Sequence, residues 1–205
     1  MSSGADAPTL GSRPAAPRRV GVLGGTFDPP HEGHLCMARE ALERAGLDEV
    51  VFVPVRSPSH KAEASAPFAD RLEMVRLLIA GEPRMSVSDV EAHLGEKSYT
   101  VPMLEELQRR LGADVELHFL IGADSLEQFH LWFRYRDILR LAKVVAFSRP
   151  GFRLANPNLT PPELARIHLL DGLWSHASSR RFRERRDCPV PAAVAAYAAA
   201  RGLYA

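Results

Sequence analysis

The chain has 205 residues and a formal net charge of +1, with 26 basic against 25 acidic side chains. Hydrophobic residues make up 46% and charged residues 25%, which is typical of a globular domain and excludes a wholly disordered or fibrous chain. A nearly neutral chain has no strong positive electrostatic potential to attract nucleic acid or an anionic membrane, so neither is expected as a partner.

Residues 1–18 are rich in Ser, Gly, Ala and Pro and are expected to form a disordered tail. They lack the apolar core of a secretion signal, so no such signal is expected. The remaining residues, 19–205, are expected to form one domain. No apolar run approaches the ~18 residues that cross a bilayer. Cys36 and Cys188 match no zinc or redox spacing, which favours reduced thiols in a cytoplasmic protein.

Strand-like and helical patterns alternate along this domain. Branched apolar runs predict strands over residues 19–23, 50–53, 85–90, 115–121, 143–147 and 167–170. Helical spacing predicts helices over residues 33–45, 71–80, 100–111, 125–141, 178–186 and 191–201. Asp70 is the expected N-cap of the second helix, and Gly202 the C′ residue of the last. The alternation predicts an α/β fold, a Rossmann-like doubly wound parallel sheet with helices on both faces, in a single domain.

The strongest motif, GGTFDPPHEGH, runs from Gly24 to His34 directly after the first predicted strand. Open α/β sheets bind ligands at the carboxyl ends of their strands, where helix N-termini attract anions. Gly24 and Gly25 allow close approach of the backbone, and the main-chain N–H groups of Thr26 and Phe27 can then hold a phosphate. The glycine spacing fits neither a GxGxxG fingerprint nor a P-loop, which disfavours a dinucleotide-dependent redox enzyme.

His31 and His34 lie three positions apart at the start of the first helix, so both rings can face one side, and Gly33 removes bulk between them. Two imidazoles beside a positive helix end are suited to stabilising charge on a phosphoryl group during transfer. The alternatives are a zinc pair, for which no third ligand stands at a recognisable spacing, and structural histidines that cap the helix. No residue is assigned as a metal ligand.

The stretch from Gly24 to His34 resembles the HxGH signature of the nucleotidyltransferase α/β phosphodiesterase superfamily. From about Val20 to Tyr204 the chain is similar to one branch, the bacterial nicotinate-nucleotide adenylyltransferases, which join nicotinate mononucleotide to the AMP part of ATP. This resemblance implies that ATP and nicotinate mononucleotide are the substrates, and that Mg²⁺ is bound through the substrate phosphates rather than by a protein cage. A homo-oligomer is compatible with the sequence.

Two segments match the pyridine side of this family. The segment Ser98–Thr100 borders the pyridine pocket in the family, where Thr100 offers its N–H to the nicotinate carboxylate; capping of the helix by Ser98 or Thr100 is compatible with that role. Trp132, eight positions after Asp124 and followed by Phe133, stacks on the pyridine ring in the family. The alternative for Trp132 is a core residue.

A third match on the mononucleotide side is the loop of residues 54–61. His60 and Lys61 match the family's phosphate contacts, whereas Val55 stands in place of an Asn and Ser59 in place of a Pro. Because the family's Asn contacts the mononucleotide, its replacement removes a direct contact. The residues assigned to the mononucleotide are Thr26, Phe27, His60, Lys61, Thr100, Trp132 and Phe133.

The ATP side has matches at two strand ends and near the C-terminus. Asp124 ends a strand, where a carboxylate accepts hydrogen bonds from ribose hydroxyls; an N-cap role is the alternative. Arg149 matches an Arg-Pro-Gly motif, although a lone arginine is more often a solvated loop residue. The residues assigned to ATP are Gly24, Gly25, Gly33, Gly122, Asp124, Arg149, Ser178, Ser179 and Arg183.

The cluster of residues 176–185 resembles the Ser-rich helix start that cradles the ATP triphosphate in the family. Ser178, Ser179 and Arg183 match it, and the departures are Ala177, Arg180 and Phe182. A solvated helix face or an RNA-binding patch is the alternative for this arginine-dense run. For the whole chain, the rival functions are another HxGH nucleotidyltransferase, such as a phosphopantetheine adenylyltransferase, and a nucleotide-binding regulator without turnover.

Overall fold

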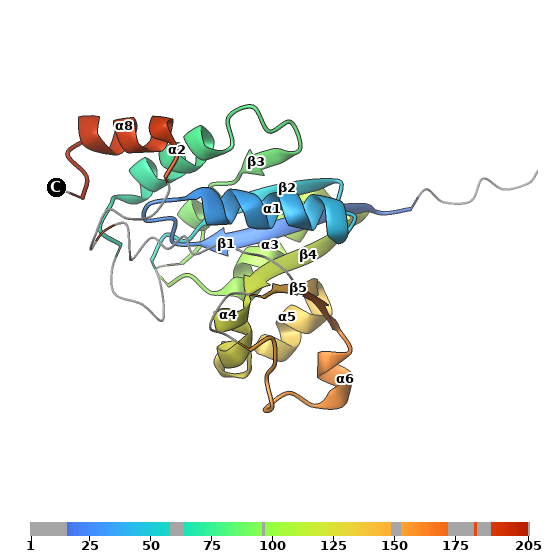
Figure 1. Ribbon diagram of the computed structural model, residues 1–205. Helices are drawn as coiled ribbons and strands as arrows, with labels where there is room; N and C mark the ends of the chain where they lie inside the picture. The colour runs from blue at the N-terminus through green and yellow to red at the C-terminus, as the bar shows by residue number, and fades with distance from the viewer. Residues whose placement is uncertain are drawn as a thin grey trace, which may run out of the picture.

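The computed structural model describes residues 16–57, 64–95, 97–148, 153–171, 183 and 190–204. Six strands form one sheet in the order β3-β2-β1-β4-β5-β6, and every neighbouring pair is parallel (Figure 1). The strands are β1 (Arg18–Gly25), β2 (Glu49–Pro54), β3 (Met85–Val87), β4 (Val115–Gly122), β5 (Lys143–Phe147) and β6 (Ile167–Leu170). This order confirms the predicted doubly wound parallel sheet: from β1 the strands follow toward β3 on one side and from β4 toward β6 on the other, so the strand order switches between β1 and β4.

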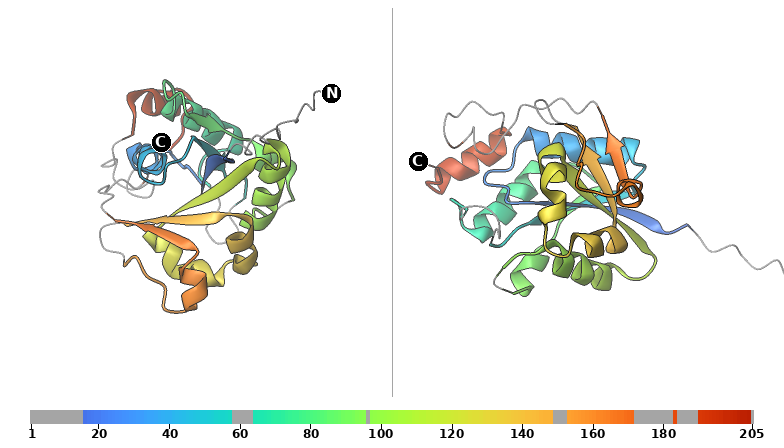
Figure 2. Two further views of the ribbon diagram at one scale, coloured as in Figure 1. Left: turned by 90° about the vertical axis from the view of Figure 1, so that its right-hand side faces the viewer. Right: turned by 90° about the horizontal axis from the view of Figure 1, so that it is seen from below.

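Helices cover both faces of the sheet, as the two views of Figure 2 show. One face packs against α1 (Glu32–Arg44), α2 (Phe68–Leu78) and α8 (Ala192–Ala200). The opposite face packs against α3 (Thr100–Leu111), α4 (Ala123–Gln128) and α5 (Tyr135–Leu141). The remaining elements are short: η1 (Val90–His93), η2 (Phe129–Leu131) and α6 (Pro161–Leu164).

The alternation of side chains along β1 explains how one strand serves two cores. Val20 and Val22 are fully buried against the α3 side, whereas Leu23 belongs to the core on the α1 side. Gly21 faces the α1 side too, and a Cβ there would lie 2.8 Å from a methyl carbon of Leu47. The glycine therefore allows the chain after α1 to pack directly on the central strand.

Three sequence predictions differ from the structure: the N-cap role of Asp70, the length of the strand at 85–90 and the single helix over 125–141. Asp70 is not an N-cap, because α2 begins earlier, after Pro67; its carboxylate instead accepts hydrogen bonds from Tyr197 Oη at 2.8 Å and from Arg201 Nε at 3.0 Å. The predicted strand 85–90 stops at Val87, where the chain turns into η1. The turn is stabilised at Ser88, whose hydroxyl accepts the N–H of Val90 at 3.2 Å.

The predicted helix 125–141 is divided into α4, η2 and α5. The division falls at Trp132, which has an extended backbone, and at Arg134, which has a left-handed φ of 53°. The segment α6 was not anticipated by the sequence. Gly202 has a φ of 63° directly after the C-cap of α8, so its predicted C′ role is confirmed. Residues 1–15, and the predicted helix 178–186 apart from Arg183, lie outside the described residues.

Candidate active site

The candidate site lies at the carboxyl ends of β1 and β4, which are neighbours at the point where the strand order switches. The turn after β1, from Thr26 to His31, connects to α1, and Gly122 at the end of β4 leads into α4. This crevice is where doubly wound sheets bind ligands, and it contains the HxGH residues. The topology therefore brings together segments separated by about ninety residues in the sequence.

The turn after β1 is tightly built around Phe27. Its ring is 1% exposed, and its backbone φ of 50° lies in the left-handed region that non-glycine residues seldom adopt. A Cβ at Gly25 would lie 3.0 Å from that ring, so only glycine fits there without displacement. Gly24 is less constrained, because its Cβ would make an ordinary contact of 3.6 Å with Phe119.

The two imidazole rings of the HxGH motif stack on one another at the start of α1. The ring centroids of His31 and His34 are 3.7 Å apart with an interplanar angle of 24°. His31 is the N-cap residue, and its backbone N–H donates to Nδ1 of His34 at 3.2 Å. A neutral His34 therefore carries its proton on Nε2, which makes that nitrogen a hydrogen-bond donor. The edge of His34 also packs against Phe27, with ring centroids 4.8 Å apart.

Capping and catalysis by these histidines are compatible in this geometry. The reciprocal bonds of His31 and His34 form a capping box, which was the structural alternative considered for them. His31 is buried and His34 half-buried, at a helix N-terminus whose dipole favours an anion. The arrangement can therefore place an imidazole donor and backbone N–H groups beside a phosphoryl group.

The end of β4 places a carboxylate beside the same crevice. Gly122 is the N-cap of α4, so the alternative in which Asp124 caps this helix is not observed. The Asp124 side chain folds back over Gly122, where a Cβ would lie 2.6 Å from its Oδ1. Gly122 thus allows the carboxylate to lie against the strand end while remaining partly exposed.

The start of α3 does not use its predicted side-chain caps. Tyr99 is the N-cap residue without a side-chain hydrogen bond, and Thr100 is the first helical residue. Ser98 instead ties α3 to the chain leaving β2, since its Oγ accepts the N–H of Ser57 at 3.1 Å. Its own N–H donates to the Ser57 carbonyl at 3.2 Å.

Aromatic side chains group near this helix start. Phe133 is half-exposed and its ring centroid lies 4.7 Å from that of Tyr99. Trp132 is half-buried, with ring centroids 5.6 Å from Phe129 and 6.0 Å from Phe119. One side of the indole therefore packs on the core, which accounts for the core alternative, while part of it stays accessible.

Five assigned residues lie outside the described part of the chain: His60, Lys61, Arg149, Ser178 and Ser179. Arg183 is described, and its guanidinium donates to the backbone carbonyl of Asp28 and lies 3.7 Å from the Asp28 carboxylate. The one described residue of the Ser-rich cluster is thus next to the turn that carries the histidines.

Comparison with known proteins identifies the family. The model of the cytidylyltransferase-like family matches residues 22–185. A nicotinate-nucleotide adenylyltransferase of Dehalococcoides mccartyi is 39% identical over 199 residues, covering 91% of this chain and 97% of the relative. The chain belongs to the nicotinate-nucleotide adenylyltransferase family. A second family member, from Trichlorobacter lovleyi, is 46% identical over 169 residues, covering 80% of this chain and 79% of the relative.

Solved structures show the same fold at low sequence identity. The nicotinic acid mononucleotide adenylyltransferase of Plasmodium falciparum, complexed with NaAD, superposes with a TM-score of 0.74 at 17% identity. The match covers 91% of this chain and 97% of that one. The arrangement of strands and helices in this adenylyltransferase family is therefore retained where most side chains differ.

Asp28, within the quoted motif, has a structural role that the sequence did not reveal. Its carboxylate accepts the N–H of Ser65 at 2.7 Å, the N–H of Ala66 at 3.0 Å and the hydroxyl of Tyr204 at 2.7 Å. Burial is the main cause that raises the pKa of the Tyr204 hydroxyl, and its hydrogen bond to Asp28 raises this pKa further. The turn after β1 is thereby joined to the chain before α2 and to the chain after α8, which lies beside it in Figure 1.

Glu91 is a second buried carboxylate that the sequence gave no reason to select. It accepts hydrogen bonds from the Ser98 hydroxyl and the Arg56 backbone N–H, and its burial raises the pKa of the carboxyl despite them. Its Oε2 has no hydrogen-bond partner among the described residues. Glu91 therefore joins the chain leaving β2 to the start of α3.

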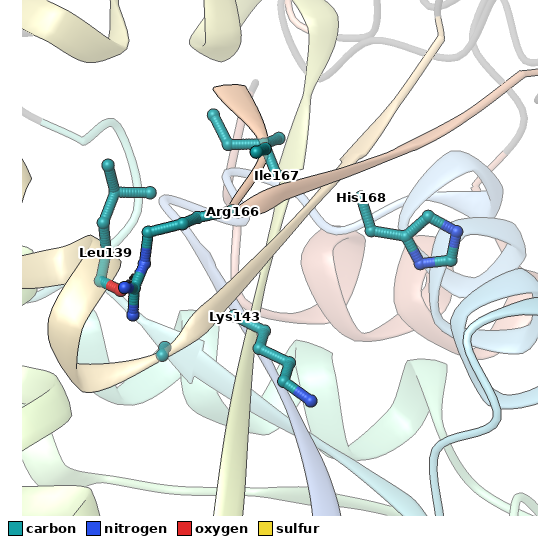
Figure 3. A pocket seen from close by; sticks show the side chains of 7 residues that line it. Leu139, Lys143, Arg166, Ile167 and His168 are labelled. Carbon is teal, nitrogen blue, oxygen red and sulfur yellow. Dashed lines mark hydrogen bonds between the residues drawn. The ribbon is translucent and has the colours of Figure 1, made fainter. Parts of the chain in front are cut away.

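A cavity of about 520 Å³ lies at the opposite edge of the sheet, near the starts of β5 and β6. Figure 3 shows Arg166 turned toward Leu139 and His168 turned the other way. Arg166 donates to the Leu139 carbonyl at 3.0 Å, and Lys143 pairs with Glu116 at 2.8 Å. Two of the basic side chains that line the cavity, Lys143 and Arg166, are thus already bound to acceptors of the protein. The cavity is separate from the HxGH crevice.

The described part of the chain contains neither a membrane-spanning helix nor a metal-binding cluster of side chains. None of the helices in that part of the chain has the length and apolar character required to cross a bilayer. Within the same residues, no three His, Cys, Asp or Glu side chains gather closely enough to hold a metal ion.

Proposed function

We propose that this chain transfers the adenylyl group of ATP to nicotinate mononucleotide, producing nicotinate adenine dinucleotide and pyrophosphate. The stacked pair His31 and His34 at the N-terminus of α1, beside the carboxyl ends of the neighbouring strands β1 and β4, is the observation that carries this proposal. The relatives that share up to 46% of their residues with this chain bear the name of that activity.

The reaction is a direct displacement at the α-phosphorus of ATP. A phosphate oxygen of the mononucleotide forms the new bond to this phosphorus, and the bond to the bridging oxygen of the β-phosphate breaks, releasing pyrophosphate. The attacking phosphate is already ionised near neutral pH, so the step requires no general base. Catalysis then consists of aligning two phosphates and stabilising the charge that develops between them.

The HxGH residues would act at the α-phosphate. His34 can donate from Nε2, because its Nδ1 is occupied by the His31 N–H. The lack of a side chain at Gly33 would let the phosphate approach the start of the helix. Ser178, Ser179 and Arg183 would bind the β- and γ-phosphates, and the position of Arg183 beside Asp28 supports this role.

The mononucleotide would lie between the turn after β1 and the start of α3. The N–H groups of Thr26 and Phe27 would hold its phosphate, aided by His60 and Lys61, and the N–H of Thr100 its carboxylate. Trp132 would stack on the pyridine ring, since part of its indole remains exposed beside Phe133. On the ATP side, Asp124, Gly122 and Arg149 would contact the nucleoside.

A divalent cation, Mg²⁺, is part of the proposal and would enter with the phosphates of ATP. No residue of the chain is assigned as its ligand, so the ion would be coordinated mainly by phosphate oxygens and water. Its contribution would be to neutralise charge on the triphosphate.

The experiment measures pyrophosphate release from purified chain with ATP and Mg²⁺, in parallel with nicotinate mononucleotide, nicotinamide mononucleotide and phosphopantetheine. Release that depends on nicotinate mononucleotide supports the proposal. Release with phosphopantetheine alone would identify another HxGH enzyme, and nucleotide binding without any release would identify a regulator.

A further inference from the structure

Among the described residues, Arg71 in the first turn of α2 is the most deeply buried charged side chain that the proposed mechanism does not use. It is 1% exposed, and its guanidinium lies 5.5 Å from the centre of the Phe68 ring. Burial lowers its pKa and the Asp28 carboxylate opposes that shift, but a guanidinium stays protonated in proteins. A buried cation is costly unless its hydrogen bonds are satisfied, so its partners indicate what it does.

Within the described part of the chain, every hydrogen bond of this guanidinium goes to a backbone carbonyl oxygen. Nη1 donates to Thr26 at 2.8 Å and to Val55 at 2.6 Å. Nη2 donates to Arg56 at 3.1 Å, and Nε to Ala66 at 3.0 Å. A fixed fork of donors therefore binds three separate segments: the turn after β1, the chain leaving β2 and the chain before α2.

The bond to Thr26 has a direct consequence for the candidate phosphate site. The carbonyl of Thr26 and the N–H of Phe27 belong to one peptide group, and this peptide is trans, so the two point in opposite directions. Because Arg71 binds the carbonyl side, the Phe27 N–H must point away from α2. A charged donor also polarises the peptide, which strengthens the N–H as a donor on its other side.

This peptide needs such a restraint, because Phe27 has a left-handed φ of 50°. That conformation is unfavourable for a residue with a side chain and persists only where the surroundings impose it. The buried Phe27 ring restrains one side of the residue, and Arg71 restrains the carbonyl that precedes it. Without the guanidinium, the Thr26–Phe27 peptide could rotate and direct its N–H elsewhere.

We propose that Arg71 is a positioning residue, which aims the Phe27 N–H at the phosphate of the mononucleotide by holding the Thr26 carbonyl. The inference rests on the proposed function, since it takes the acceptor phosphate to bind at this turn. Arg71 itself does not touch substrate, because its side chain is buried beneath the turn.

Kinetics of Arg71→Met and Arg71→Lys test this role, with Arg76→Met as the matched control. Arg76 lies on the same helix but is exposed, and it pairs only with Glu73 at 3.1 Å among the described residues. Arg71→Met is expected to raise KM for nicotinate mononucleotide by at least about tenfold while KM for ATP stays within about twofold. Arg71→Lys is expected to recover part of this loss, because an ammonium can still donate to some of the carbonyls, and Arg76→Met to match the wild type.

A measurement on the wild-type chain keeps the proposal testable if the variants do not fold. In ¹H–¹⁵N spectra, the Phe27 amide is expected to shift when nicotinate mononucleotide is added and to remain unmoved by ATP alone. An unmoved Phe27 amide, or folded Arg71→Met with unchanged KM for the mononucleotide, would overturn the inference. A wild-type chain that releases no pyrophosphate would instead refute the proposed function, so the two failures are distinguishable.

Discussion

His34→Asn separates the two roles of His34, capping of α1 and stabilisation of the α-phosphate. An asparagine oxygen can accept the His31 N–H in place of Nδ1, but it provides nothing at the position of Nε2. Turnover is therefore expected to fall by about 10²–10³-fold, the cost of removing one preorganised donor to a developing charge. His34→Ala should lose as much turnover and, in addition, some stability.

The stability difference between the two variants follows from the contacts of the ring. Alanine removes the hydrogen bond from His31, worth about 0.5–1.5 kcal/mol, and the ring contacts with His31 and Phe27, worth a similar amount. The expected loss is about 1–3 kcal/mol, below the 5–15 kcal/mol typical of a folded domain. The variant should therefore fold.

The assay combines steady-state pyrophosphate release with thermal unfolding, and His93→Asn is the control. His93 is exposed and pairs with Asp89 far from the HxGH motif in sequence, so its replacement should leave turnover unchanged. Near-normal turnover in a folded His34→Asn variant would refute the argument that Nε2 stabilises the transferred phosphoryl group.

Three further predictions concern other parts of the molecule. Trp132→Ala is expected to raise KM for the mononucleotide by about three- to tenfold, with Trp132→Phe milder, and a defect confined to KM for ATP would argue against pyridine stacking. The hydrogen bond from the Tyr197 hydroxyl, followed by Arg201, holds the pKa of Asp70 in the folded protein below its usual range. The ionised carboxylate therefore stabilises the folded protein above about pH 4, and this stabilisation disappears as the pH falls through the lowered pKa of the folded state. Asp70→Asn should thus lower Tm by about 2–4 °C at pH 7, with the gap closing in acid; a gap that is constant with pH would exclude the ion pair as its cause. EDTA should abolish pyrophosphate release and added Mg²⁺ restore it, whereas activity that survives EDTA would contradict the metal requirement.

Local patterns predicted much of this fold, because they depend on few neighbours. The apolar spacing at Val101, Leu104 and Leu107 predicted α3 with the bounds that the structure has, and these side chains are all buried. The strand at residues 143–147 was equally clear, since its branched run is covered on both faces. The pairing of His31 with His34 followed from helical spacing alone.

Long-range contacts could not be predicted in the same way. Asp70 is typical of a helix cap in sequence, but its partners are Tyr197 on α8 and Arg201 directly after it, more than a hundred residues away. Arg71 and Arg76 look alike in sequence, yet Arg71 is buried under the turn after β1 and Arg76 is exposed. Which of them faces the turn depends on how α2 packs beside β2, and no local pattern contains that information.

The most direct test of the account is a crystal structure of the chain with nicotinate mononucleotide and a non-hydrolysable ATP analogue. It should show an oxygen of the α-phosphate within about 2.7–3.2 Å of a ring nitrogen of His31 or His34, with the mononucleotide phosphate on the turn after β1. A triphosphate bound elsewhere, with neither ring near the α-phosphorus, would contradict the central claim.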